Sequence, residues 1–229
     1  MTNNLLLLHG ALGSQDQFQE LKNLLAPRFN VYTLNFSGHN GEEFENEFSI
    51  DLFQKDVLRF MKHHSLEQTS ILGYSMGGYV ALKFAMDFPE KVEKIMTLGT
   101  KIDWNPDTAA QELKMLNPEK IEMKVPRFAK ILQESYAPAD WKTVVSKTAA
   151  MIQGLGNGDA LKTENFRQIK TPVLAAIGSE DAMVSREETQ ALAQHLKQGK
   201  YLEIEDFPHP IGQVNQKRLS KIMSGYFSE

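Results

Sequence analysis

The stretch Gly73-Tyr74-Ser75-Met76-Gly77-Gly78 decides the fold of this chain. It follows the short apolar run 69–72 and precedes segment 76–87, whose apolar residues recur at helical spacing. A serine flanked by glycines two positions away on each side, between a strand and a helix, matches the G-x-S-x-G nucleophile elbow. The glycines keep a sharp turn free of side chains, and the helix N-terminus favours developing negative charge. The pattern predicts covalent acyl chemistry at Ser75; a serine that only caps the helix is the simpler alternative.

A second glycine-rich turn, His9-Gly10-Ala11-Leu12-Gly13-Ser14, follows the first predicted strand and precedes the first predicted helix. Such a turn lets a backbone N–H point toward the nucleophile, where it can bind an oxyanion. We therefore expect an oxyanion hole made by the amides of Ala11 and Met76, the residue after the serine. A plain strand-to-helix turn is the alternative.

Strands and helices alternate along the chain, and several strands are continuous apolar runs, which is typical of strands buried on both faces of a parallel sheet. The pattern predicts an α/β fold with a doubly wound, mostly parallel sheet. The expected strands are 4–8, 31–35, 69–72, 94–98, 173–177 and 201–204, and the expected helices are 15–25, 50–63, 76–87, 186–196 and 213–227. The last helix but one opens with a capping box, Ser185-Arg186-Glu187-Glu188.

About 70 residues separate the strands at 94–98 and 173–177, far more than a crossover needs. Segments 107–116, 125–134 and 139–155 show helical spacing. We expect residues 104–165 to form a helical cap inserted into a core made of 1–103 and 166–229. An ordinary extra helical layer is the alternative.

Composition excludes several classes of protein. The 229 residues are 41% hydrophobic and 24% charged, with a net charge of −4, so a nucleic-acid-binding surface is not expected. The absence of cysteine excludes disulfides, thiolate zinc sites and thiol catalysis. The leucine run at 5–8 is too short to span a bilayer and has no basic segment before it, so we expect no signal peptide, no membrane span and a cytoplasmic protein.

Together these stretches resemble the α/β-hydrolase superfamily. The resemblance rests on Leu5-Leu6-Leu7-Leu8-His9-Gly10, on the elbow, on 172–181, which is similar to the strand and turn carrying the triad acid, and on Phe207-Pro208-His209-Pro210, which is similar to the histidine loop. Two departures concern Asn35, where an aspartate is common, and Pro210 directly after the histidine. The chain also starts at the strand before His9, which predicts a sheet of about six strands.

The triad order in this fold is serine, acid, histidine. Only His195 and His209 follow Asp181, and His195 lies late in an amphipathic helix, so His209 is the predicted base. Asp181 is the predicted acid, and Asp103, after an earlier strand, is the alternative; Glu180 lies beside Asp181 but is expected to point away. Adjacent His63 and His64 cannot share one helix face, and no metal is assigned.

The predicted function is hydrolysis of a small-molecule carboxylic ester by a serine hydrolase without a cofactor. The cap aromatics Trp104, Phe128, Tyr136 and Trp141 are candidates for a substrate pocket, although aromatic residues at helical spacing are more often core residues. Two other classes stay open. One is a C–C bond hydrolase or lyase, in which Lys101 or Arg127 binds a substrate carboxylate; the other is a ligand-sensing protein that keeps the triad. The sequence does not set the oligomeric state.

Overall fold

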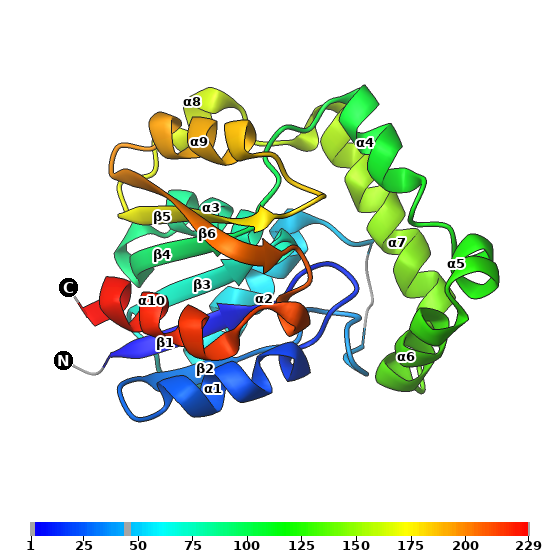
Figure 1. Cartoon of the computed structure of the whole chain (residues 1–229), viewed down its shortest axis with the longest axis horizontal. Helices are drawn as coiled ribbons and strands as arrows, with labels where there is room; N and C mark the ends of the chain where they lie inside the picture. The colour runs from blue at the N-terminus through cyan, green and yellow to red at the C-terminus, as the bar shows by residue number, and fades with distance from the viewer. Residues whose placement is uncertain (1–2, 44–46, 229) are drawn as a thin grey trace.

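A computed structural model describes residues 3–43 and 47–228. Its centre is a six-stranded sheet in the order β2-β1-β3-β4-β5-β6, in which every neighbouring pair is parallel (Figure 1). The predicted α/β fold with six strands is therefore confirmed. The strands are β1 (Asn4–Leu8), β2 (Asn30–Thr33), β3 (Thr69–Tyr74), β4 (Val92–Leu98), β5 (Val173–Glu180) and β6 (Gly199–Pro208).

The leucine run of β1 shows why the sheet is buried on both faces. Successive side chains of a strand point to opposite faces. Leu5 and Leu7 pack into one apolar cluster, and Leu6 and Leu8 pack into the other. All four leucines are fully buried, so a polar residue at any of these positions would lose its water without gaining a partner.

Helices cover both faces of the sheet. On one face lie α1 (Gln19–Leu25) and α10 (Gln216–Ser228), whose apolar residues join Leu5 and Leu7. On the other lie α2 (Ile50–His63), α3 (Met76–Asp87), α8 (Thr163–Phe166) and α9 (Arg186–His195). Short 3-10 turns occupy Gln15–Phe18, Pro89–Lys91 and Ile211–Gln213, and a π-helical turn occupies Leu155–Asp159. Among the described residues, no helix is long and apolar enough to cross a membrane.

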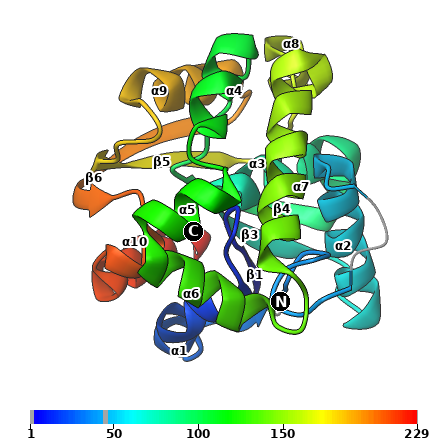
Figure 2. The ribbon, with the colours of Figure 1, turned by 90° about the vertical axis from the view of Figure 1, so that its right-hand side faces the viewer.

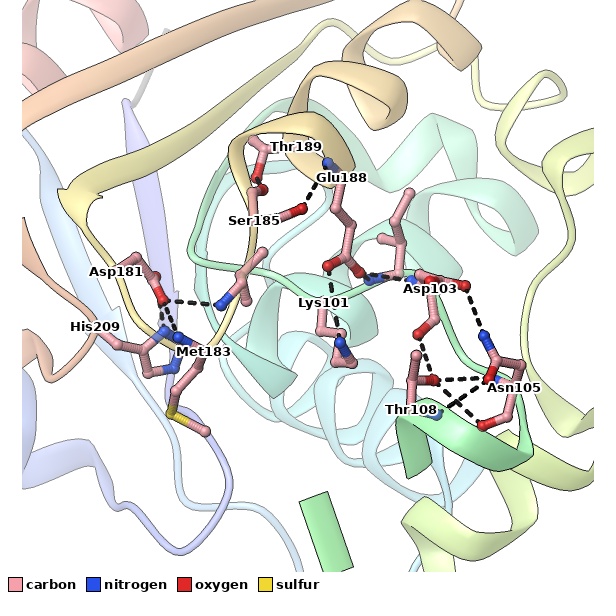
Figure 3. A network of polar contacts seen from close by, with 12 residues as sticks. Lys101, Asp103, Asn105, Thr108, Asp181, Met183, Ser185, Glu188, Thr189 and His209 are labelled. Atoms are coloured by element: carbon pink, nitrogen blue, oxygen red, sulfur yellow. Dashed lines mark hydrogen bonds and ion pairs between the residues drawn. The ribbon is translucent and has the colours of Figure 1, made fainter. Parts of the chain in front are cut away.

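The start of α9 corrects one sequence prediction. The Ser185 hydroxyl accepts the N–H of Glu188 at 3.0 Å, which is the expected helix cap. The reciprocal half of the predicted capping box is absent, because the Glu188 carboxylate points away from the helix start. It accepts the backbone N–H groups of Ile102 and Asp103 instead, as Figure 3 shows. The contact between Glu188 and the loop after β4 therefore takes the place of the local contact that the capping box predicts.

A helical insert connects β4 to β5 and lies beyond the carboxyl ends of the strands (Figures 1 and 2). Its helices are α4 (Pro106–Leu113), α5 (Pro118–Lys124), α6 (Pro126–Tyr136) and α7 (Trp141–Gly154). The first three begin with proline, whose missing N–H costs nothing at the first helical position. Helix α5 was not predicted from the sequence, although the pair Asn117-Pro118 is a helix-start signal. The Asn117 side chain accepts the N–H of Lys120 at 2.8 Å.

Candidate active site

The turn between β3 and α3 holds Ser75 in a strained backbone conformation. Its φ is 51° and its ψ is −119°, a region that residues with a Cβ rarely adopt. Neighbouring glycines allow the turn to be this tight. A Cβ on Gly73 would lie 2.4 Å from the Gly78 Cα atom, and one on Gly77 would lie 2.3 Å from the Leu8 carbonyl oxygen. The Ser75 N–H donates to the Leu98 carbonyl at 2.9 Å, which ties the turn to β4.

Ser75, His209 and Asp181 lie together at the carboxyl ends of their strands. The His209 Nε2 atom is 3.2 Å from the Ser75 hydroxyl oxygen, and its Nδ1 atom is 2.7 Å from an Asp181 carboxylate oxygen. The histidine and aspartate side chains are almost completely buried. An imidazole placed between a hydroxyl and a carboxylate in this way can accept the hydroxyl proton and be stabilised once it is charged.

The loop after β5 fixes the Asp181 carboxylate. One oxygen accepts the backbone N–H groups of Met183 and Val184, both at 2.9 Å, and the other faces His209 (Figure 3). Burial acts to raise the pKa of Asp181, but His209 and the two N–H groups outweigh it and hold the pKa below its usual value. The carboxylate is therefore charged and oriented at neutral pH.

The alternative residues lie elsewhere. The Asp103 carboxylate accepts a hydrogen bond from the Asn105 amide, and its backbone N–H is held by Glu188. Glu180 is exposed at the end of β5. His195 ends α9 and lines a different hollow from the one at Ser75. The structure thus brings together the three residues expected from the triad order, and none of these alternatives.

Gly99 also contributes to the site, although it was not predicted from the sequence. It follows β4 with a φ of 60°, and a Cβ there would lie 2.8 Å from the Asp181 carboxylate and 3.1 Å from the His209 Nδ1 atom. Only glycine combines this conformation with so close an approach. In the sequence this position is a lone glycine directly after a strand, a pattern that is common in turns of every kind.

Ala11 and Met76, whose backbone amides are the expected oxyanion donors, both line the cavity at Ser75. Buried His9 orders the turn that carries Ala11. Its Nδ1 atom lies 2.8 Å from the Gly10 carbonyl oxygen, and its Nε2 atom accepts the N–H of Phe36 at 3.2 Å. Backbone amides at a helix start and in a fixed turn are groups that can stabilise an oxyanion.

A cavity of about 400 Å³ opens over Ser75, between the strand ends and the insert. Of the four cap aromatics, Trp104 and Phe128 line it, whereas Tyr136 and Trp141 do not. Tyr136 is buried, and its hydroxyl donates to the Gly13 carbonyl at 3.3 Å; Trp141 is buried in the apolar cluster at the start of α7. Both act as packing residues. Most of the remaining lining is apolar and comes from residues Leu12, Ile50, Met76, Met115, Leu116, Met151, Ile152, Leu155, Met183 and Val184.

One side of this cavity carries charge. Lys101 and Glu112 both line it, and the Lys101 ammonium lies 3.8 Å from the Glu188 carboxylate and 5.6 Å from the centre of the Trp104 ring. Burial raises the pKa of Glu112, and the nearby positive charge of Lys101 opposes this shift. Arg127 does not line the cavity. A fixed ammonium in an otherwise apolar cavity can orient a polar group of a ligand.

A larger hollow of about 680 Å³ lies beside β2 and α2, lined by Asn35, Asp56, Arg59 and His63 among others. It includes none of the three residues of the serine–histidine–aspartate set. Asp56 there accepts hydrogen bonds from the Ser37 N–H and hydroxyl, both at 2.8 Å, so this buried carboxylate serves as a loop anchor.

Comparisons with known proteins agree with this architecture. Residues 3–118 match the family described as alpha/beta hydrolase fold, and the chain belongs to this family. The chain is 27% identical over 159 residues to ethanol acetyltransferase 1 of Cyberlindnera jadinii, a match that covers 69% of this chain and 45% of that protein. The chain spans less than half the length of most curated relatives that it matches.

Solved structures with the same fold include two hydrolases. The 2-hydroxy-6-oxo-6-phenylhexa-2,4-dienoate hydrolase from Rhodococcus has a TM-score of 0.82 at 19% identity, covering 100% of this chain and 91% of that one. A thermophilic esterase from Thermogutta terrifontis has a TM-score of 0.76 at 19% identity, covering 99% and 91%. At such identities the likeness shows the shared fold.

Proposed function

We propose that this protein is a serine hydrolase that cleaves a carboxylic ester through an acyl-enzyme. The observation that carries the proposal is the unbroken contact from the Ser75 hydroxyl through His209 to Asp181, at 3.2 and 2.7 Å, at the floor of an apolar cavity. Membership of a hydrolase family supports the same reaction class, but fold alone does not define a substrate.

In the proposed mechanism Ser75 attacks the ester carbonyl while His209 accepts its proton. The negative oxygen of the tetrahedral intermediate binds the amides of Ala11 and Met76. His209 then donates the proton to the leaving alcohol, and a water molecule activated by His209 hydrolyses the acyl-enzyme. Asp181 keeps the Nδ1 proton of His209 in place throughout these steps.

The cavity favours esters with a small or medium acyl group. Its volume of about 400 Å³ lies at the lower end of the range for ligand sites, and its lining is mainly apolar. Residues 104–165 act in this proposal as a cap, because α4, α6 and α7 contribute Glu112, Phe128, Met151 and Ile152 to the wall. Trp104 and Phe128 are the proposed aromatic contacts.

The direct test replaces the nucleophile. Ser75→Ala should lower kcat by roughly four to six orders of magnitude and abolish labelling by a fluorophosphonate. Ser65→Ala is the matched control, because Ser65 is an exposed serine with a similar φ of 52° far from the cavity. It should keep full activity. Near-normal turnover by the Ser75 variant would refute the mechanism, and ligand binding without any turnover would favour a sensing protein.

The charged side of the cavity supports a second candidate, a C–C bond hydrolase in which Lys101 binds a substrate carboxylate. Lys101 is the observation in its favour, since Arg127 lies outside the cavity. Turnover of a vinylogous diketone carrying a carboxylate, with KM raised at least tenfold by Lys101→Met, would support this candidate. Turnover of simple esters together with inactivity on the diketone would support the ester hydrolase.

A further inference from the structure

Exposed apolar side chains gather on the insert. Six large apolar residues are exposed among the described ones: Met115, Met123, Val125, Phe128, Ile131 and Met183. Five of these belong to the segment 115–131, and Met123 is the most exposed, at 73%. Such a concentration in one segment of the chain indicates a contact surface more than scattered exposure does.

This patch continues into the cavity. Met115, Phe128 and Met183 line the cavity as well as being exposed, so they form its rim. Phe128 and Ile131 share one face of α6 through their three-residue spacing. Figure 1 shows α5 and α6 at the end of the insert farthest from α9. A surface or molecule that contacts α5 and α6 therefore lies next to the mouth of the cavity.

The same end carries excess positive charge. Between residues 114 and 134 there are five basic and three acidic side chains, whereas the whole chain has a net charge of −4. Two of the acidic residues are already paired, Glu122 with Lys142 and Glu134 with Lys130. Lys124 and Arg127 flank Val125 within 122–128, a run of seven consecutive exposed residues.

Charge decides between the candidate occupants of this surface. Two copies of the chain meeting symmetrically would place the basic ends against each other, which is unfavourable. An anionic lipid surface instead attracts the lysine and arginine side chains and accepts the apolar side chains between them. The exposed run is the corner where α5 ends at Lys124 and α6 begins at Pro126, which suits insertion into a soft interface.

We propose that the α5–α6 corner of the insert, residues 120–131, docks on an anionic lipid surface and holds the cavity mouth against it. Met123 and Val125 enter the interface, and Lys124 and Arg127 contact the lipid headgroups. The inference goes beyond the proposed function, because docking needs no turnover and can be measured separately from it.

The test is co-sedimentation of the full chain with vesicles. Binding should be at least tenfold stronger to vesicles of phosphatidylcholine with 30 mol% phosphatidylglycerol than to phosphatidylcholine alone, and should weaken in 0.5 M salt. The double variant Lys124→Gln/Arg127→Gln should weaken it by roughly ten- to thirty-fold. The matched control Lys55→Gln/Lys62→Gln removes the same charge from exposed positions of α2 and should bind normally.

A second variant tests the apolar contribution. Met123→Ser/Val125→Ser changes only exposed side chains outside the cavity lining. It should reduce vesicle binding at least fivefold while far-UV circular dichroism and thermal unfolding stay unchanged. Equal binding to both vesicle types, equal loss in the α2 control, or a dimer that these serine substitutions abolish would overturn the proposal. If the protein proves not to hydrolyse esters, the vesicle-binding result can still be interpreted independently.

Discussion

Ser75 holds a backbone conformation that costs a residue with a Cβ about 1–3 kcal/mol. Its surroundings enforce that conformation. The Ser75 N–H is held by the Leu98 carbonyl, and the Thr100 hydroxyl donates to the Ser75 carbonyl at 3.1 Å. Both partners come from β4 and the loop after it. Strand β4 and the loop after it therefore help to orient the serine, together with the glycines of the elbow.

At the same scale, Gly99→Ala tests whether Asp181 and His209 can keep their positions only if residue 99 has no side chain. The added methyl group would lie within about 3 Å of both Asp181 and His209, so one of them must move. We expect kcat to fall at least tenfold with little change in KM, since a misplaced catalytic group mainly affects the chemical step. Steady-state kinetics on a short p-nitrophenyl ester would measure this.

Gly41→Ala is the control for strain alone. Gly41 has a φ of 84°, and the nearest atom to an added Cβ is the Ala137 carbonyl oxygen at 3.8 Å, an ordinary contact. This variant should lose some stability but keep its kcat. If both variants lost kcat equally, the space beside Asp181 would have no special role.

Sequence patterns predicted the three residues that the structure brings together, but not the groups that position them. Ser75 is marked by its own neighbours, and His209 and Asp181 follow from the order of the triad residues along the chain. Gly99 and Glu188 act through atoms about 80 to 110 residues away in the chain, and no local pattern encodes such a contact. Tyr136 and Trp141 show the converse, because aromatic residues at helical spacing look alike whether they face a cavity or a core.

At the scale of elements, α2 and α3 were predicted best, the first beginning after the Ser49 cap and the second directly after the elbow serine. The bounds of α2 and α3 agree with the expected ranges 50–63 and 76–87. The strands β5 and β6 were predicted too short because their ends pair with each other, Glu180 with Pro208, across the sheet. The expected single helix at 15–25 is a 3-10 turn followed by α1. Pairing and packing set these ends, and a single sequence does not reveal them.

The contact between α9 and the loop after β4 is a second testable link. Glu188→Gln replaces one carboxylate oxygen by an NH₂ group. If the remaining oxygen accepts the two backbone N–H groups, the NH₂ group faces the Lys101 ammonium, and two hydrogen-bond donors then meet. Since Glu188 is nearly buried, we expect a loss of roughly 1–3 kcal/mol in the free energy of unfolding. Urea unfolding followed by tryptophan fluorescence would measure it, with a blue shift or quenching at Trp104 as a local signal.

Glu187→Gln provides the comparison on the same helical turn. Its side chain is exposed, so the free energy of unfolding should change by less than about 0.5 kcal/mol. Equal effects at 187 and 188 would mean that the loss comes from charge at the start of α9 and not from the contact with the loop.

For the molecule as a whole, two buried histidines connect the turn after β1 to the insert. His9 and His39 are fully buried with ring centres 5.0 Å apart, and His39 also packs against Phe48 and Tyr136 of α6. Burial lowers the pKa of His9 to about 3, with the neighbouring His39 adding to the effect. Burial likewise lowers the pKa of His39 to about 4. Both rings are neutral in the folded protein at neutral pH.

These shifts predict how stability depends on pH. In the unfolded chain a histidine titrates near 6.5, so below that pH the unfolded state binds protons that the folded state does not. The free energy of unfolding should therefore fall as the pH falls from about 6.5 toward 4, by up to about 1.4 kcal/mol per pH unit for each histidine. Between pH 6.5 and 5 most carboxylates contribute little, because they titrate lower. Urea unfolding at intervals of 0.5 pH unit would measure the slope, and His39→Leu should reduce it by about half in that window. A stability that stays flat from pH 7 to 5, or an unchanged slope in the His39 variant, would show that this pair is not what makes the fold sensitive to acid.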